Sequence, residues 1–134
     1  MSVLSDLGQY LEAQGIGTQA VDLFLSQVPD SPDDIVTVFE YAGNAPSKMG
    51  ANRSPGIQIR TRSKSYADAR QKIDDVYLIL SAIGDEFQDS AAEGVEINGT
   101  LYLHFETVQE PLPLGTDSKG RHELAQNFIV TYRS

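Results

Sequence analysis

Hydrophobic residues recur along this chain with two different periods, and each period predicts one kind of element. Near the amino terminus, apolar residues at three- and four-residue spacing follow Ser2, a good N-cap residue, and a glycine follows where the helix would stop. The same spacing returns after Ser65 and Asp68, which resemble a capping box. We therefore expect amphipathic helices over residues 3–14 and 65–84.

Alternating apolar and polar residues predict the strands. The alternation is clearest in residues 57–62, where the odd-numbered positions are apolar or threonine and would face a core, while Gln58, Arg60 and Arg62 would face solvent. The dipeptide Asn98-Gly99 is the commonest two-residue hairpin signal. We expect strands at residues 21–28, 35–41, 57–62, 95–97, 100–108 and 124–133.

Two long segments show neither period. Residues 42–56 and 109–123 are rich in glycine, proline and polar residues, so we expect both to be loops. Residues 29–34 are rich in proline and aspartate, so we expect a turn there that leads into the returning strand at residues 35–41. The predicted order is α-β-β-β-α-β-β-β. We expect a single α+β domain over residues 1–134, with a mixed, mainly antiparallel sheet and a long helix packed on it.

Composition supports one ordinary globular domain. The chain has 134 residues, of which 40% are hydrophobic and 22% charged, enough for one core without metal or disulfide support. It contains no cysteine, which excludes disulfides, thiolate metal sites and cysteine nucleophiles. Neither a signal peptide nor an apolar stretch of membrane-spanning length is present, so we expect synthesis in the cytosol and no membrane partner.

Charge is strongly segregated along the chain. Seven of the ten basic residues lie between Lys48 and Lys72, where Asp68 is the only acidic residue, so this segment carries a net +6 in a chain of net charge -9. Such segregation speaks to partners more than to fold. It predicts a basic patch that meets nucleic acid, a small anion or the acidic face of another copy. A pI near 4.5 argues against a duplex-DNA reader.

Candidate catalytic residues are few. His104 and Glu106 lie two residues apart on one predicted strand, so they could act as a base and its orienting group, but no nucleophile accompanies them. A histidine hydrogen-bonded within the sheet is the simpler interpretation. His122 lies in a polar segment and is expected to be solvated. No familiar catalytic or nucleotide-binding motif is present in the sequence.

Candidate ion sites are equally weak. Asp30, Asp33 and Asp34 invite a calcium interpretation but lack the spacing of an EF-hand loop, and turn chemistry explains them better. The segment 42–56 could cradle phosphate with help from Lys48 and Arg53, yet a strand follows it instead of a helix. An interaction arm is the better interpretation. We expect no catalytic, metal or cofactor site.

Several short motifs together resemble one known family. They are V-F-E-Y at residues 38–41, S-P-G-I-Q-I-R at 54–60, the helix opening S-Y-A-D-A-R at 65–70, the hairpin V-E-I-N-G-T at 95–100 and the last strand F-I-V-T-Y-R at 128–133. In this arrangement the chain resembles the tail terminator family of tailed phages, which includes head-tail joining proteins described as minor capsid proteins. The resemblance covers most of the chain.

The resemblance implies a structural role in the virion. Family members form a ring, commonly a hexamer, that caps the tail tube and stops its polymerisation. The implied partners are other copies of the chain, the tail-tube protein and the head-side connector or stopper, with DNA passing through the lumen without specific binding. The implied location is the tail or neck of the virion, after assembly in the host cytoplasm. No cofactor and no enzymatic activity are implied.

In such a ring the segregated charge would lie at the subunit contact. Basic residues of one copy would face acidic residues of the next, and we expect the contact to involve Lys48, Arg53, Arg60, Arg62, Lys64, Asp85, Glu86 and Asp89. Other neck, head-completion or tail-tube components remain alternatives. So do a small anion- or nucleotide-binding domain using Lys48 and Arg53, and an enzyme working through His104 and Glu106.

Overall fold

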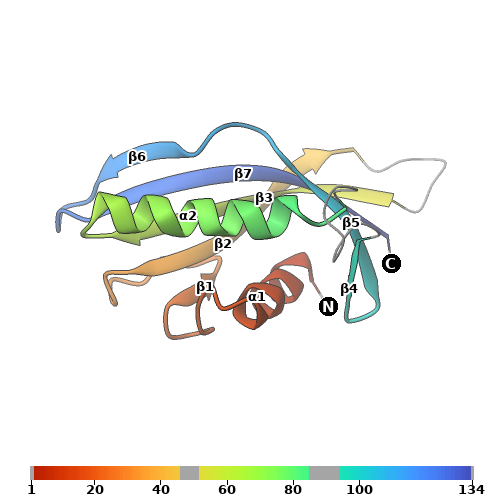
Figure 1. Ribbon diagram of the computed structural model, residues 1–134, viewed down its shortest axis with the longest axis horizontal. Helices are drawn as coiled ribbons and strands as arrows, with labels where there is room; N and C mark the ends of the chain where they lie inside the picture. The colour runs from red at the N-terminus through yellow and green to blue at the C-terminus, as the bar shows by residue number, and fades with distance from the viewer. Residues whose placement is uncertain (1, 46–51, 85–93, 134) are drawn as a thin grey trace.

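The computed structural model of the protein describes residues 2–45, 52–84 and 94–133 (Figure 1). The helices in these ranges are α1 (Val3–Ala13) and α2 (Tyr66–Ser81). The strands are β1 (Leu23–Leu25), β2 (Ile35–Asn44), β3 (Asn52–Ser63), β4 (Val95–Ile97), β5 (Thr100–Thr107), β6 (Leu112–Thr116) and β7 (His122–Arg133).

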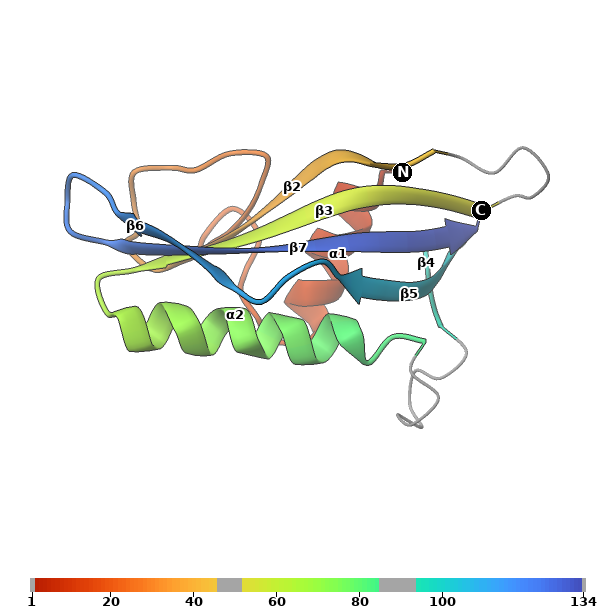
Figure 2. The same ribbon diagram turned by 90° about the horizontal axis from the view of Figure 1, so that it is seen from above.

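All of these strands belong to one mixed sheet with β7 at its centre. Its order is β1-β2-β3-β7-β5-β4, and β6 also pairs with β7. β3 pairs with β7 on one side, while β5 and β6 take opposite halves of its other side (Figure 2). Only β1 and β2 pair in parallel among the described strands. The expected mainly antiparallel sheet is confirmed.

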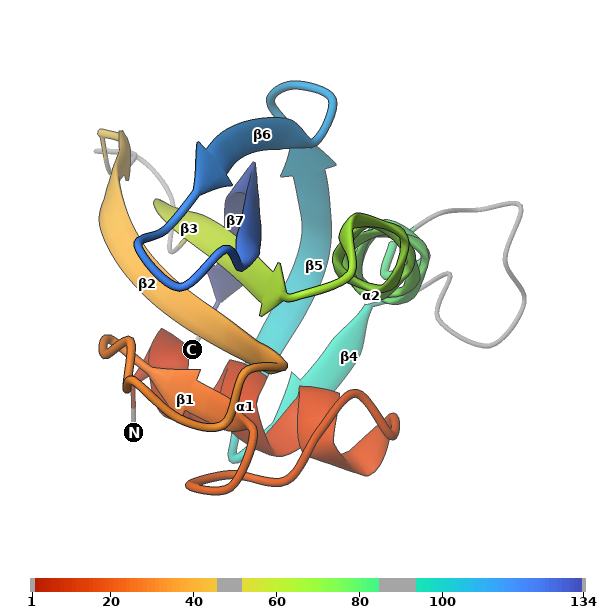
Figure 3. The ribbon, with the colours of Figure 1, turned by 90° about the vertical axis from the view of Figure 1, so that its left-hand side faces the viewer.

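The sheet is curled, and both helices cover the same face of it (Figure 3). α1 packs against β1 and β2, whereas α2 packs against β3, β5 and β7. The core between helices and sheet consists mainly of Val3, Leu7, Leu11, Leu23, Val36, Val38, Ile57, Ile59, Val76, Leu80, Ile83, Tyr102, Phe105, Phe128 and Val130. Burial of such side chains stabilises the fold by roughly 1.5–3 kcal/mol each.

The helices begin where the sequence predicts. Ser2 caps α1 in a capping box with Ser5, and the Ser65 hydroxyl accepts the backbone N–H of Asp68 at 3.2 Å. The buried stripe of α2 consists of Ala69, Ile73, Val76 and Leu80. Tyr66 and Tyr77, at positions that fit the same spacing, are exposed. α2 has 16 residues, so the long helix expected over 65–84 is not confirmed.

The predicted loop over residues 42–56 is wrong at both ends. β2 extends to Asn44 and β3 begins at Asn52, so strand pairing occupies part of this segment. Pro55 made this strand hard to predict, because proline has no backbone N–H to donate to a neighbouring strand and is confined to edges and bulges. The register of β2 on β3 does shift here, between Tyr41 and Asn44. The remaining tip of the segment, with Lys48, lies outside the described residues.

The predicted loop over residues 109–123 also contains a strand. β6 has the sequence L-P-L-G-T and pairs with β7, with a register shift between Pro113 and Gly115. Proline and glycine weaken the sequence signal for a strand, but both are tolerated at an edge or a bulge. The described order is therefore α-β-β-β-α-β-β-β-β, one strand more than the sequence predicted.

Two strand predictions needed further correction. The strand expected over 21–28 shortens to β1, bounded by positive φ angles at Ala20 and Ser26, and it runs parallel to β2 where a returning strand was expected. The Asn98-Gly99 hairpin is confirmed, with φ angles of 51° and 84°. In β5 the alternation changes phase at a register shift after Tyr102, so that both Tyr102 and Phe105 are buried.

Candidate interaction surface

The sheet face opposite the helices is the first candidate surface. We call it the open sheet face, and define it by Phe39 and Tyr41 of β2, Gln58 and Arg60 of β3, and Asn127 of β7, which line a hollow of about 240 Å³. Strand register brings them together, because Phe39 lies opposite Gln58 and Gln58 lies opposite Asn127. This face is polar and aromatic.

A row of side-chain contacts crosses the open sheet face. Asn127 Oδ1 accepts a hydrogen bond from Gln58 Nε2 at 3.0 Å, and Gln58 Oε1 accepts one from Arg60 Nε at 2.6 Å. The guanidinium carbon of Arg60 lies 4.9 Å from the centre of the Phe39 ring, a cation–π contact. The side chain of Arg60 is therefore held in one orientation from two sides.

Arg62 is not on the solvent face that alternation predicted. It is 5% exposed, because the segment before β2 closes over this end of the sheet. Its guanidinium donates to the backbone oxygens of Pro32 at 2.7 Å and Asp33 at 3.2 Å. Burial and the nearby charge of Arg121 lower the pKa of Arg62. Arg62 is thus used within the subunit and is not available to a partner.

Arg121 forms a second buried basic site, which the sequence analysis missed. It is 4% exposed and pairs with Asp117 at 2.8 Å, Asp30 at 3.3 Å and Asp33 at 3.4 Å. Hydrogen bonds from Arg121 and Lys119 help to lower the pKa values of Asp30 and Asp117. Arg121 was overlooked because its position fell in a predicted loop.

The Asp30, Asp33 and Asp34 turn is a partner of basic side chains. Besides Arg121, Lys119 pairs with Asp30, and Lys64 lies 3.5 Å from Asp33. No group of three or more potential metal ligands is present in the part of the chain that the structure describes. Its side chains thereby link the start of β2 to the connection between β6 and β7.

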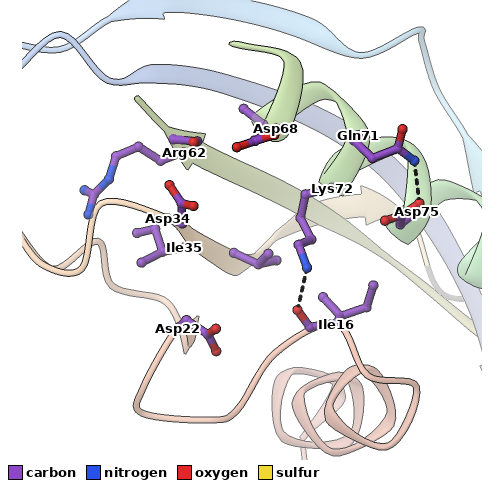
Figure 4. A pocket seen from close by; sticks show the side chains of 12 residues that line it. Ile16, Asp22, Asp34, Ile35, Arg62, Asp68, Gln71, Lys72 and Asp75 are labelled. Atoms are coloured by element: carbon purple, nitrogen blue, oxygen red, sulfur yellow. Dashed lines mark hydrogen bonds between the residues drawn. The ribbon is translucent and has the colours of Figure 1, made fainter. Parts of the chain in front are cut away.

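A groove of about 370 Å³ lies on the helix side of the sheet, between α2, the start of β2 and the segment after α1 (Figure 4). Its lining includes four carboxylates, those of Asp22, Asp34, Asp68 and Asp75. Lys72 crosses it and donates to the backbone oxygen of Ile16 at 3.0 Å. The carboxylates give this groove an acidic character, opposite to that of the open sheet face with Arg60.

A second groove, of about 480 Å³, lies between α2 and the segment joining β5 to β6. Its walls include the exposed apolar side chains of Leu78 and Val108. Gln126 is 2% exposed and donates to the Gln109 carbonyl at 3.0 Å, while its Oε1 accepts no hydrogen bond from the described residues. This groove is the more apolar of the two.

The structure brings together only part of the predicted contact set. Arg60 and Lys64 lie on or next to β3, and Arg53 is exposed near its start. Lys48, Asp85, Glu86 and Asp89 lie outside the described residues. Arg70 and Lys72 are engaged within the subunit, since Arg70 pairs with Asp74 at 3.6 Å and Lys72 bonds to Ile16.

The histidine candidates lie apart from the grooves. His104 and Glu106 are exposed on β5, and neither side chain makes a hydrogen bond to another described residue. His122 is half-buried with its ring edge-on to Tyr66 at 5.7 Å, so the expectation of a solvated side chain is wrong.

No helix in the described ranges is long and apolar enough to span a membrane.

Comparisons with known proteins agree with this fold. A chain of the "Virion of native gene transfer agent (GTA) particle" superposes with a TM-score of 0.70 at 13% sequence identity, over 99% of this chain and 96% of that chain. The family model described as bacteriophage tail terminator protein matches residues 10–133. No curated protein sequence matches the chain.

Together, the fold and the family match define the class as a structural protein of phage tails. Within that class, the chain belongs to the bacteriophage tail terminator family. The family resemblance found in the short sequence motifs is confirmed. Members of this family are structural proteins of the phage virion.

Proposed function

We propose that this protein forms a ring, most simply a hexamer, that caps the phage tail tube and joins it to the head-side connector. The match to the tail terminator family over residues 10–133 carries this proposal. The partners are then other copies of the chain, the tail-tube protein and the connector or stopper, and the location is the neck or tail of the virion.

Free strand edges support self-association. Among the described strands β6 pairs only with β7, and its five residues are exposed, including Leu112 and Leu114. Among the described residues, β1 pairs with Val36–Val38 alone, so the rest of β2 forms a second free edge there. Open edges with exposed apolar residues are liabilities in a monomer. Two different edges suit the head-to-tail contacts of a ring.

Charge supports the same arrangement after one correction. Arg62 leaves the proposed contact because it is buried within the subunit. We propose that Lys48, Arg53, Arg60 and Lys64 of one copy face acidic residues of the next, with Asp85, Glu86 and Asp89 as the first candidates. Such charges mainly guide encounter and register, so apolar contacts supply most of the affinity.

The net charge of -9 also suits a ring through which DNA passes. Carboxylates repel phosphates, and without many exposed Lys and Arg side chains a duplex gains little from counterion release. We propose that DNA traverses the lumen without specific binding. A duplex titration at about 50 mM salt should show no saturable binding.

The decisive experiment combines assembly with function. Sedimentation velocity and electron microscopy should show closed rings, and added protein should stop the elongation of tail tubes assembled from the tail-tube protein. Copolymerisation into the tube instead would identify a tail-tube subunit. If rings form equally well at low salt and at about 1 M salt, where the screening length is about 3 Å, charge matching is not the basis of assembly.

A further inference from the structure

The open sheet face holds Arg60, whose orientation is fixed and whose guanidinium has no acidic partner among the described residues. Arg60 Nε is bonded to Gln58, and the guanidinium carbon lies 4.9 Å from the Phe39 ring centre. Among the described residues, its two terminal nitrogens donate no hydrogen bond, and no carboxylate oxygen lies within 4 Å of its guanidinium nitrogens. The free edge of the guanidinium is therefore available to a ligand.

On the same side of the sheet as Arg60, Glu123 is already placed beside another cation. Glu123 lies opposite Arg62 in the β3–β7 ladder, and it lines a small neighbouring hollow together with Arg60 and Arg62. The hollow over the open sheet face itself has no carboxylate among its lining residues. Arg60 thus provides an uncompensated positive charge in a recess otherwise formed by amides and aromatic rings.

The chemistry of this recess specifies its ligand. A planar guanidinium binds carboxylate or phosphate through two parallel N–H···O bonds, and such pairs are stronger and more directional than neutral hydrogen bonds. Here the stacking on Phe39 and the Gln58–Asn127 pair fix the guanidinium before the ligand arrives. Little side-chain entropy remains to be lost on binding.

We infer that Arg60 is a preorganised anchor for a carboxylate of a second copy of this chain. The inference rests on the proposed self-association and names one contact within it. The chain has 19 acidic residues against 10 basic ones, so a neighbouring copy presents carboxylates in excess. A second copy can place one carboxylate against this local positive charge while its other charges lie away from the contact. The phosphates of a nucleic acid are closely spaced and all meet the net charge of -9. Local charge complementarity therefore favours the second copy.

The test compares four single variants by sedimentation velocity over a concentration series. Arg60→Gln removes the charge, and Arg60→Lys keeps the charge but removes the planar guanidinium. Gln58→Leu keeps the guanidinium but removes the hydrogen bond that holds Arg60 Nε. Arg133→Gln is the matched control, since Arg133 is an exposed arginine at the end of β7 and lies outside the proposed contact. Thermal unfolding of each variant reports whether the fold is retained.

We expect Arg60→Gln to weaken association at least about tenfold, the loss of one charge-assisted hydrogen bond or more. Arg60→Lys and Gln58→Leu should each weaken it severalfold, and Arg133→Gln should change it less than about twofold. If Arg60→Gln fails to fold, Arg60→Lys and Gln58→Leu still test the inference, because each of them leaves most of the site in place.

If the folded Arg60 and Gln58 variants associate like wild type, the inference about Arg60 is overturned. The proposed ring is not affected by that result. An equal loss in Arg133→Gln would also overturn the inference, since the change in net charge would then explain the effect. Inorganic phosphate and a short duplex provide the remaining arm: binding that depends on Arg60, without a change in association, would assign the anchor to phosphate. A wild-type protein that stays monomeric at all concentrations would overturn both proposals.

Discussion

Replacing Tyr102 by phenylalanine tests the contact that ties α1 to the sheet. Tyr102 on β5 and Asp6 on α1 are each 1% exposed, and the Tyr102 hydroxyl donates to Asp6 Oδ2. Asn98 of the hairpin donates to Asp6 Oδ1 at 2.9 Å. The substitution Tyr102→Phe keeps the ring in the core and removes one of these donors from a buried carboxylate.

The expected loss follows from the charge on the acceptor. Hydrogen bonds to charged groups contribute roughly 1.5–3 kcal/mol, so Tyr102→Phe should lower the free energy of unfolding by about 2 kcal/mol. At about 2.1 cal/mol/K per residue, a chain of 134 residues has an unfolding entropy near 0.28 kcal/mol/K. The melting temperature should therefore fall by about 7 °C.

Urea unfolding at pH 7 measures this loss directly, with an unchanged slope showing that the denatured state is the same. Tyr132→Phe is the matched control. Its ring lies 5.6 Å from that of Tyr102, but its hydroxyl makes no hydrogen bond with the described residues. A loss below about 0.5 kcal/mol for Tyr102→Phe, or an equal loss for the control, would refute the reasoning.

Alkaline pH provides an independent check. Burial and the hydrogen bond to Asp6 raise the pKa of Tyr102 above its ordinary value near 10. A group whose pKa is raised on folding contributes stability that is complete below its unfolded pKa and declines as pH rises above it. Above about pH 10 the wild type should therefore lose stability more steeply than Tyr102→Phe, by up to about 1.4 kcal/mol per pH unit.

Three further predictions concern other parts of the fold. Arg121→Gln should lower the urea midpoint at pH 7, and the loss should shrink as pH falls below about 4. The reason is that Asp117 has a lowered pKa, and the stability from such a carboxylate is lost in acid. Gly99→Ala should lower the free energy of unfolding by about 1 kcal/mol, because alanine is strained at its φ of 84°. Gly84→Ala should lower it further, as measured by calorimetry, because the added Cβ would also collide with a backbone carbonyl of β5. Leu80→Ala should cost roughly 2–5 kcal/mol in urea titrations, since Leu80 is fully buried; a loss under about 1 kcal/mol would contradict that packing.

The features predicted correctly from the sequence are those set by local chemistry. Ser2 and Ser65 cap their helices, and the Asn98-Gly99 turn closes its hairpin, because each depends on a few neighbouring residues. The core side of β3 was also predicted, since Ile57 and Ile59 are fully buried. In these places one period or one turn motif determines the structure.

The features missed depend on residues distant in sequence. Alternation placed Arg62 in solvent, but it cannot show that the segment around Pro32 closes over that end of the sheet. Strand β6 forms because β7 pairs with it, whereas its own sequence, which contains Pro113, does not predict a strand. Arg121 and Asp30, 91 positions apart, form a pair that no local pattern reveals. The setting of Arg60 was missed for the same reason, because Phe39 and Asn127 come from the two neighbouring strands.

The central position of β7 has a consequence for how the protein is made. The strand that pairs with β3, β5 and β6 occupies residues 122–133, so during synthesis the chain must be translated beyond β7 before its sheet can close. Folding dominated by such distant pairings is slow, because loop closure precedes the contacts that reward it. Chains cut short before His122 would lack the strand that joins the two halves of the sheet. Such truncated chains would leave β3 and β5 without their common partner, so they should be more susceptible to proteolysis than the full chain.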